Sequence, residues 1–145
     1  MRLTAIAVLS LGCSIAQAQL DPAVVRAIKV DEIKWVENAA GTNAQSIIYG
    51  DPSKPGPYAY FVKWKAGNMS RPHFHPNDRH IVVLAGTWWC GSGDRFDPAS
   101  TVPMAAGTYV LHTAKGIHYD GAKDGDAILL IHGEGPATST PAEKK

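Results

Sequence analysis

The chain has 145 residues, of which 45% are hydrophobic and 19% charged, and it contains 14 glycines and 10 prolines. This length supports one compact domain with an apolar core and leaves little room for a second. The glycine and proline content is too high for a helical bundle and is typical of a turn-rich β protein. The net charge of +1 comes without a basic cluster, so the electrostatic footprint of a nucleic-acid-binding protein is missing.

The first 18 residues resemble a secretory signal peptide. Arg2 precedes an apolar run from Leu3 to Ile15, and Ala16-Gln17-Ala18 forms a small-residue cleavage site. The run is too short for a transmembrane helix. We therefore expect an exported protein, periplasmic or secreted, that is cleaved after Ala18 and has no membrane span. The alternatives are a buried helix of the domain and lipoprotein processing at Cys13, although Ser10 stands where lipoprotein processing favours a large aliphatic residue.

Cleavage after Ala18 removes Cys13 and leaves Cys90 as the single cysteine. An exported chain with one cysteine has no internal disulfide, so its core has to stabilise it alone. Because Cys90 follows two tryptophans, we interpret it as a small buried apolar residue rather than a reactive thiol.

The N-terminal part of the mature chain predicts one short helix followed by strands. Asp21–Val30 can form a helix with Asp21 as its cap and Pro22 in its first turn. Strands are expected over Ile33–Val36 and Gln45–Tyr49. Over Tyr58–Lys65 the side chains alternate in character with a period of two, which predicts a half-buried strand.

The remaining segments are also short and are separated by turn residues. Further strands are expected over Arg79–Ala85, Thr87–Cys90, Gly107–His112, Gly116–Tyr119 and Ala127–His132, with a loop from Asp97 to Pro103. Strands at this spacing indicate an all-β sandwich or small barrel. We divide the mature chain into an N-terminal extension with the first strands (19–57), a barrel core (58–133) and a flexible C-terminal tail (134–145).

Six histidines carry the candidate chemistry, and His73-Phe74-His75 is the informative pair. In an extended strand, residues two apart point to the same face, so both imidazoles can reach one point. Imidazole is a common neutral ligand of divalent transition metals. Pro72 and Pro76 bracket the pair and stiffen it.

The spacing Gly67-x5-His73-x-His75-x3-Arg79-x6-Gly86 resembles the first motif of the cupins. A second stretch, from Gly107 to His118, resembles the second motif, with Thr113 and Lys115 in place of its usual proline and glycine. The resemblance spans residues 58–133 and implies a small single-domain cupin with a jelly-roll β-barrel. It also implies a metal held by His73, His75 and His118. Iron(II) is favoured for such a site, and zinc, manganese, nickel or copper would also suit imidazole ligands.

The chain departs from the cupin motif at Arg79, where the family has a glutamate ligand. His80 could replace that ligand as a fourth nitrogen, but strand alternation places it on the opposite face unless a bulge intervenes. Arg79 either faces the metal and binds an anionic substrate through its guanidinium, or points outward to solvent or to Asp78.

Three neutral imidazoles with open coordination positions fit a catalytic rather than a structural metal site. We expect an oxygenase-like or isomerase-like enzyme acting on a small oxygen-rich anion, with the dioxygenase-like oxidoreductase favoured, and with Arg79 and His112 as candidate catalytic residues. His112 can be a proton shuttle or only a wall residue. The alternatives are a non-catalytic binding or sensory cupin and a degenerate metal-free scaffold. A homodimer is plausible.

The other candidates are assigned structural roles. Alternation turns Tyr119 away from the metal and makes His132 structural. Tryptophans most often fill cores and subunit contacts. Asp94, Asp97 and Asp120 lack the spacing of a calcium-binding loop.

Overall fold

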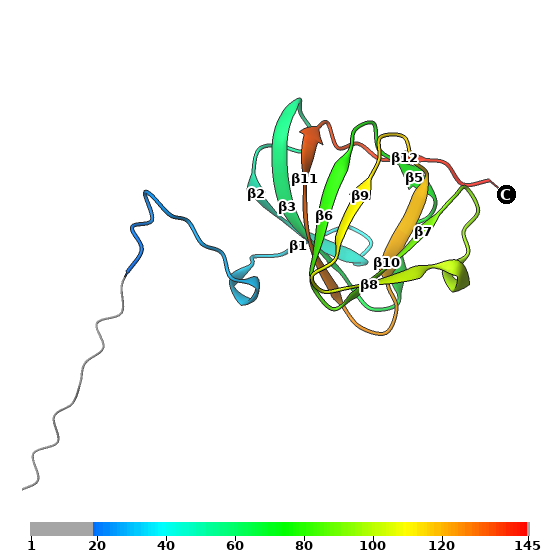
Figure 1. Cartoon of the computed structure of the whole chain (residues 1–145), viewed down its shortest axis with the longest axis horizontal. Coiled ribbons are helices and arrows are strands. Elements are labelled where there is room, and N and C mark those ends of the chain that lie inside the picture. Colours follow the sequence, from blue (N-terminus) through cyan, green and yellow to red (C-terminus); the bar gives the residue numbers. More distant parts are fainter. Residues whose placement is uncertain (1–18, 145) are drawn as a thin grey trace, which may run out of the picture. The chain divides into compact units, whose positions relative to one another are not determined.

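The computed structural model describes residues 19–144 (Figure 1). The expected signal peptide and Cys13 lie outside the described residues. The chain divides into two units, Met1–Glu32 and Ile33–Lys145, each of which is described by itself. Within residues 19–144, no helix has the length and apolar character needed to cross a membrane.

In the first unit, the helix expected over Asp21–Val30 does not form. Asp21 behaves as a cap, because its carboxylate accepts from the Ala23 amide and its carbonyl accepts from the amides of Val24 and Val25. The turn stops there, and only a three-residue 3-10 helix, η1 (Val30–Glu32), follows. This stretch is rich in β-branched residues and is short, and isolated helices of that length are marginal in water.

The second unit is an all-β jelly roll built from two antiparallel sheets, as expected (Figure 1). The first sheet runs in the order β1 (Val36–Glu37), β2 (Asn43–Tyr49), β3 (Gly56–Trp64), β11 (Ala127–Gly135), β6 (Arg79–Ala85) and β9 (Tyr109–His112). The second sheet runs in the order β12 (Thr140–Pro141), β5 (His73–Phe74), β10 (His118–Ala122), β7 (Thr87–Ser92) and β8 (Val102–Ala105), and β4 (Asn68–Met69) pairs with β10.

The core lies between the two sheets and follows the two-residue alternation of their strands. The first sheet contributes buried side chains from β3, β6 and β11, and the second sheet contributes Trp88 from β7 and Ala122 from β10. On β6, Ile81 and Val83 point inward and are almost fully buried. Since Arg79 has the same parity on this strand, it also points inward.

Two of the expected strands differ from those observed in more than a shift of their ends. Strand β3 is buried on both faces at its centre, because Ala59 and Phe61 on its outer face are buried as well. It pairs on one side with β2 and on the other with β11, so it is an internal strand rather than a half-exposed one. The strand expected over Ile33–Val36 is reduced to β1, and Trp35 instead lies under the ammonium group of Lys63.

Gly86 makes the tight connection between β6 and β7. It has a φ of +73°, and a Cβ atom at this position would lie 2.1 Å from the carbonyl oxygen of Asp126. Both observations favour glycine, which adopts positive φ without steric cost.

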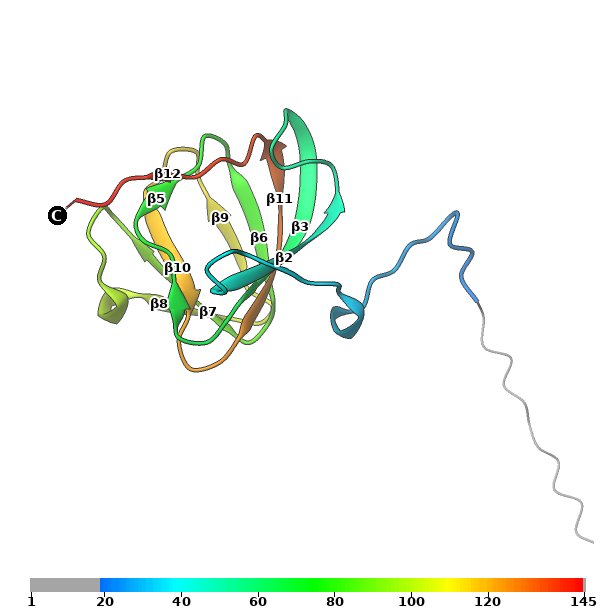
Figure 2. The ribbon, with the colours of Figure 1, turned by 180° about the vertical axis from the view of Figure 1, so that it is seen from behind.

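The region expected to be a loop between Asp97 and Pro103 contains a 3-10 helix, η2 (Pro98–Ser100), and the start of β8. The tail expected to be loose follows the edge of the second sheet (Figure 2). There β12 pairs with β5, and the amide of Ala142 donates to the carbonyl of Pro72. Glu143 and Lys144 form ion pairs with Arg71 and Asp94. We call residues 136–144 the C-terminal strap.

Candidate metal centre

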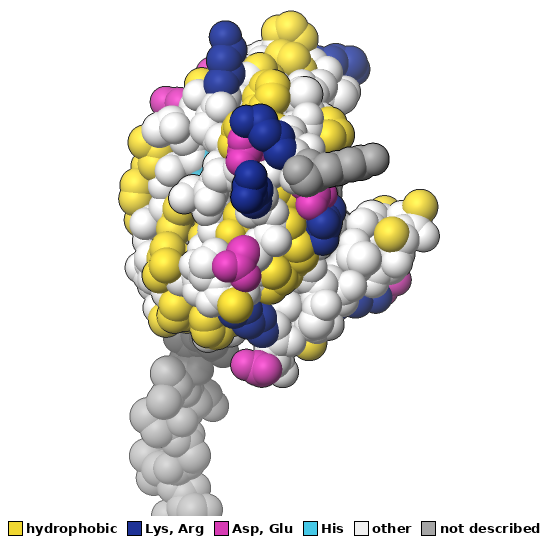
Figure 3. Space-filling model, turned by 90° about the vertical axis from the view of Figure 1, so that its right-hand side faces the viewer, with side chains coloured by type: hydrophobic (Ala, Val, Ile, Leu, Met, Phe, Trp, Pro, Cys, Tyr) yellow, Lys and Arg dark blue, Asp and Glu magenta, His cyan; other side chains and the backbone are white. Residues whose placement is uncertain are grey.

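Charged side chains of both signs are interspersed on the face shown in Figure 3, and almost no histidine surface is visible there. The histidines fall into two groups. The inner cluster, between the sheets, consists of His73, His75, His112 and His118. The outer pair, His80 and His132, lies on the opposite face of the first sheet.

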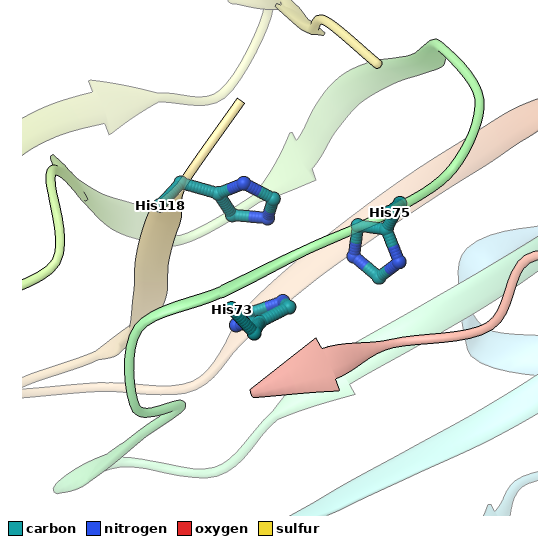
Figure 4. Close-up of side chains that lie close together, drawn as sticks. All are labelled: His73, His75 and His118. Atoms are coloured by element: carbon teal, nitrogen blue, oxygen red, sulfur yellow. The ribbon is translucent and has the colours of Figure 1, made fainter. Parts of the chain in front are cut away.

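Three members of the inner cluster converge on one point (Figure 4). His73 lies on β5, His75 follows two residues later, and His118 begins β10 directly opposite His73. One ligand atom from each of the three lies within 4.8 Å of the other two. The structure therefore brings together the three residues that the cupin resemblance implies as ligands.

Backbone carbonyls orient all three rings in the same way. The Nδ1 atoms of His73, His75 and His118 donate to the carbonyl oxygens of Arg71 (2.8 Å), Thr138 (2.9 Å) and Gly116 (2.9 Å). A carbonyl only accepts, so each Nδ1 carries the proton and each Nε2 keeps its lone pair. This is the tautomer that leaves Nε2 free as a metal ligand.

The environment also keeps the imidazoles of His75 and His118 neutral. Burial, reinforced by the charge of Arg79, lowers the pKa of His75 to about 3. Burial also lowers the pKa of His118, against the opposing influence of Asp120. Neutral imidazole is the form that binds a metal. Nε2 of His118 is buried and has no hydrogen-bond partner, so the residues present fit a divalent transition metal.

Arg79 points into the site. It is 9% exposed; one guanidinium nitrogen contacts Nε2 of His75, and the other donates to the hydroxyl of Tyr60 at 2.8 Å. Its neighbour Asp78 instead accepts from the amide of Ala114. Arg79 thus lies where the cupin motif has its glutamate, and its buried guanidinium contacts the lone pair on Nε2 of His75.

His112 lies beside the three converging histidines. Its ring centroid is 3.8 Å from that of His118 and 5.4 Å from that of Trp88. Burial lowers its pKa to about 2, so it is a weak base in the folded protein. Its Nδ1 is buried without a hydrogen-bond partner. The structure therefore places His112 within reach of the site as a neutral imidazole.

Asp120 is the residue at this site that the sequence analysis overlooked. One of its carboxylate oxygens accepts from the indole nitrogen of Trp88 at 3.2 Å, and the other lies 3.8 Å from Nε2 of His118. Together with His112 and His118 it forms a second group of possible metal ligands. The signal was present in the sequence, because Asp120 follows His118 by two residues on a strand and so shares its face.

The outer pair is separated from the site. His80 and His132 lie opposite each other on β6 and β11, with stacked rings and centroids 4.9 Å apart. A ring nitrogen of His80 is 2.7 Å from the hydroxyl of Tyr109. Alternation therefore predicted correctly that His80 points away from the three converging histidines. Tyr119 also faces away, toward Ser100 and the carbonyl of Asp97.

The other sequence candidates have structural positions. Trp88 is almost completely buried in the core. Trp89 stacks under the ammonium group of Lys123. Cys90 packs against the core, and burial raises the pKa of its thiol, which suppresses the reactive thiolate form.

A cavity of about 400 Å³ adjoins the histidines. Polar side chains, among them Arg79, Asp120 and Tyr60, line it together with apolar core residues such as Ile81 and Leu129. The C-terminal strap contributes Ala137, Ser139 and Pro141 to its wall. A concave space in which polar side chains converge among apolar ones is a candidate small-molecule site.

Comparison with known proteins supports the jelly-roll fold described above. The family model of the ChrR cupin-like domain matches residues 24–138. No curated protein matches the chain.

Solved structures match at low identity. The polyketide cyclase RemF from Streptomyces resistomycificus aligns with a TM-score of 0.66 and 13% identity over 83% of this chain and 87% of that one. The DMSP lyase DddQ from Ruegeria pomeroyi DSS-3 aligns with a TM-score of 0.59 and 18% identity over 77% and 64% of the two chains. A chain from the complex of Rhodobacter sphaeroides SigE with the anti-sigma ChrR aligns with a TM-score of 0.55 and 19% identity over 72% and 50%. At these identities the likeness establishes the fold alone.

Proposed function

The chain belongs to the ChrR cupin-like domain family, and on that premise we propose that it is a metal-dependent enzyme acting on a small oxygen-rich anion. One observation carries the proposal: His73, His75 and His118 all donate Nδ1–H to backbone carbonyls, so that their unprotonated Nε2 atoms are left to bind a metal where the three side chains converge. Iron(II) is the favoured metal, and zinc, manganese, nickel and copper also suit imidazole ligands.

A divalent metal bound by His73, His75 and His118 would polarise a substrate oxygen as a Lewis acid and, as iron, would supply oxygen chemistry. Within this framework the reaction is oxygenase-like or isomerase-like, with the dioxygenase-like reaction favoured. An anion suits the site because three neutral imidazoles leave the metal's charge uncompensated and Arg79 adds another positive charge within the cavity.

Arg79 is proposed as the anion-binding residue. The single lone pair on Nε2 of His75 can serve either the guanidinium or a metal, but not both. If Nε2 of His75 held a metal, one guanidinium N–H of Arg79 would be left without its acceptor, while the other nitrogen would still donate to the Tyr60 hydroxyl. The released N–H can donate to a carboxylate or enolate in the cavity.

His112 is proposed as a neutral contact for the substrate. Its depressed pKa makes it a poor proton acceptor at neutral pH. Its imidazole can still donate or accept a hydrogen bond, and it lines the cavity beside Trp88.

The test uses the full chain loaded with iron(II) and a panel of enolisable and phenolic carboxylic acids. Oxygen consumption and product formation are followed together, since an isomerase-like reaction gives product without consuming oxygen. We expect turnover with one class of acid and none in the His73→Ala/His118→Ala double variant. The His80→Ala/His132→Ala variant is the matched control and should retain activity. An iron-loaded protein that converts no acid in the panel contradicts the enzyme assignment.

A second candidate function is a non-catalytic binding or sensory module, with a degenerate metal-free scaffold as its extreme form. The contact between Arg79 and Nε2 of His75 favours it, because a guanidinium already satisfies one of the three ligands without a metal. In that case the protein binds an organic anion without metal, and calorimetry with the metal-free chain detects the binding while no product forms.

Export is proposed from the sequence of residues 1–18. The test is the N-terminal mass of the protein recovered from its native host, with cleavage after Ala18 expected. A lipid-modified Cys13 or an intact N-terminus would contradict that assignment. The homodimer stays a prediction, which sedimentation of the purified chain measures.

A further inference from the structure

A metal bound at the inner cluster would lack the anionic ligand that the cupin motif usually supplies. Arg79 places a cation where the cupin motif has a carboxylate ligand, and its guanidinium touches one of the candidate ligands. The three imidazoles are neutral ligands, so a divalent metal among them would have no anionic partner at the usual position. Bringing two positive groups together in a buried site is costly unless a negative charge lies close by.

Asp120 supplies a buried negative charge at the right place. Its residue exposure is 6%, and it shares the inward face of β10 with His118. Its second carboxylate oxygen lies 3.8 Å from Nε2 of His118, an atom that is itself buried and without a hydrogen-bond partner. A carboxylate oxygen of Asp120 and the unpartnered Nε2 of His118 therefore face the same space. The ligand atoms of Asp120 and His118 group with that of His112, and His118 is the member shared with the group formed by His73 and His75.

The surroundings hold Asp120 in this orientation. The indole nitrogen of Trp88 donates to one carboxylate oxygen and leaves the other toward His118. The Ser70 hydroxyl accepts from the Asp120 amide, and the Ser70 amide donates to the Asp120 carbonyl at 2.7 Å. A carboxylate fixed by its neighbours with one oxygen left over is what a preorganised metal ligand requires.

We propose that Asp120 is the anionic ligand of the metal centre, bound beside His118 in place of the carboxylate that the chain lacks at Arg79. The proposal rests on the metal centre of the proposed function and adds a residue to it. An ionised carboxylate buried without a cation is strongly disfavoured, and a divalent metal removes that cost. In this arrangement Arg79 is free to bind the substrate.

Cobalt(II) is the probe, because the intensity and position of its absorption bands report the number and type of its ligands. Asp120→Asn keeps the size of the side chain and the oxygen that accepts from Trp88. Asp126→Asn is the matched control, because it makes the same charge change at a carboxylate that accepts from the Ala66 amide instead. Each variant in the full chain is titrated with cobalt(II), and the thermal unfolding of the metal-free protein checks its fold.

Loss of a supporting contact around a metal typically weakens binding 10- to 100-fold, so loss of a ligand should raise the cobalt Kd about 100-fold or more. We expect this in Asp120→Asn together with changed cobalt bands, and neither effect in Asp126→Asn. Wild-type affinity and an unchanged spectrum in Asp120→Asn would overturn the proposal. If Asp120→Asn does not fold, Asp120→Glu takes its place: retained binding with shifted bands supports ligation, and bands identical to those of the wild type overturn it.

The cobalt titration distinguishes a failure of the metal centre from a failure of the role assigned to Asp120. A wild-type chain that takes up no cobalt removes the metal centre, and with it both the proposed function and the role of Asp120. A wild-type chain that binds cobalt while Asp120→Asn binds it equally well removes only the role of Asp120. The carboxylate would then be an acceptor for Trp88 and nothing more.

Discussion

The inner cluster and the outer pair contain the same residue type on neighbouring strands, yet only the inner cluster can form a metal site. Arg79 and His80 are adjacent on β6, and alternation sends one into the cavity and the other to the outer face. Inside, each of three imidazoles has a backbone carbonyl that orients it. Outside, His80 meets a tyrosine hydroxyl, which can donate or accept and so leaves the tautomer open. Backbone acceptors, rather than the number of histidines, therefore distinguish the two groups.

The largest expected effect comes from removing ligands on the inner side. His73→Ala/His118→Ala should abolish stoichiometric metal uptake, whereas His80→Ala/His132→Ala should retain it. With free metal at 100 times its Kd, the intact site should gain about 2.7 kcal/mol of unfolding free energy. Elemental analysis and thermal unfolding with and without metal measure both effects. Equal loss of metal in the two double variants would remove the distinction between the groups.

Truncation of the C-terminal strap tests whether the backbone carbonyl that orients His75 contributes to metal affinity. A chain ending at Pro136 lacks the Thr138 carbonyl that orients His75, and its metal affinity should fall about 10- to 100-fold. A chain ending at Pro141 keeps this carbonyl and loses the ion pairs of Glu143 and Lys144 together with the backbone hydrogen bonds of Ala142 and Lys144. Exposed pairs contribute little, so the longer chain should bind metal like the wild type. Metal titration of both truncated proteins measures the difference, and equal affinities would show that the carbonyl is dispensable.

The two adjacent residues of β6 allow a gain-of-binding experiment. Arg79→Glu removes the guanidinium from Nε2 of His75 and introduces a carboxylate at the cupin ligand position, so metal affinity should rise about 10-fold or more. Without metal, the same variant should be less stable than the wild type by about 1–3 kcal/mol, because a buried carboxylate is left unpaired. His80→Glu changes the outer face and should alter neither quantity appreciably. Unchanged metal affinity in Arg79→Glu would mean that position 79 does not face the metal.

The smallest effect on stability and metal binding is expected from a substitution at Tyr109, which contacts His80 of the outer pair. Tyr109→Phe removes the hydroxyl that lies 2.7 Å from His80, on a side chain that is 57% exposed. Substitutions at such surface positions usually change stability by less than about 0.5 kcal/mol. Urea unfolding and metal titration should both resemble the wild type. A loss of metal binding in this variant would show that the outer face communicates with the site.

Much of the fold could be predicted from local signals. Strand β6 matches its predicted bounds, because a β-branched run ends at a glycine that the turn requires. Short strands such as β5 and β12 were missed, since two-residue elements exist only through pairing with distant segments. The helix at Asp21 failed for a related reason: its cap formed, but propensity alone could not extend it.

The candidate site also contains some features that sequence patterns predict and others that they do not. The shared face of His73 and His75, and the outward direction of His80, followed from alternation, whereas the inward direction of the pair was implied by the cupin resemblance. Asp120 could have been found by the same rule, had it been applied from His118 rather than from calcium-loop spacing. The Thr138 carbonyl could not have been found, because a backbone acceptor has no signature in side-chain chemistry and the strap reaches His75 only in the folded chain.

Long-range ¹H–¹⁵N NMR of the histidine rings in the full chain, before and after addition of zinc, tests the three-histidine metal centre most directly. We expect protonated Nδ1 atoms at His73, His75 and His118 in the metal-free protein. Zinc should shift the Nε2 resonances of these three rings and leave those of His80 and His132 in place. Nε2 resonances at His73, His75 and His118 that do not move at saturating zinc would contradict the metal centre.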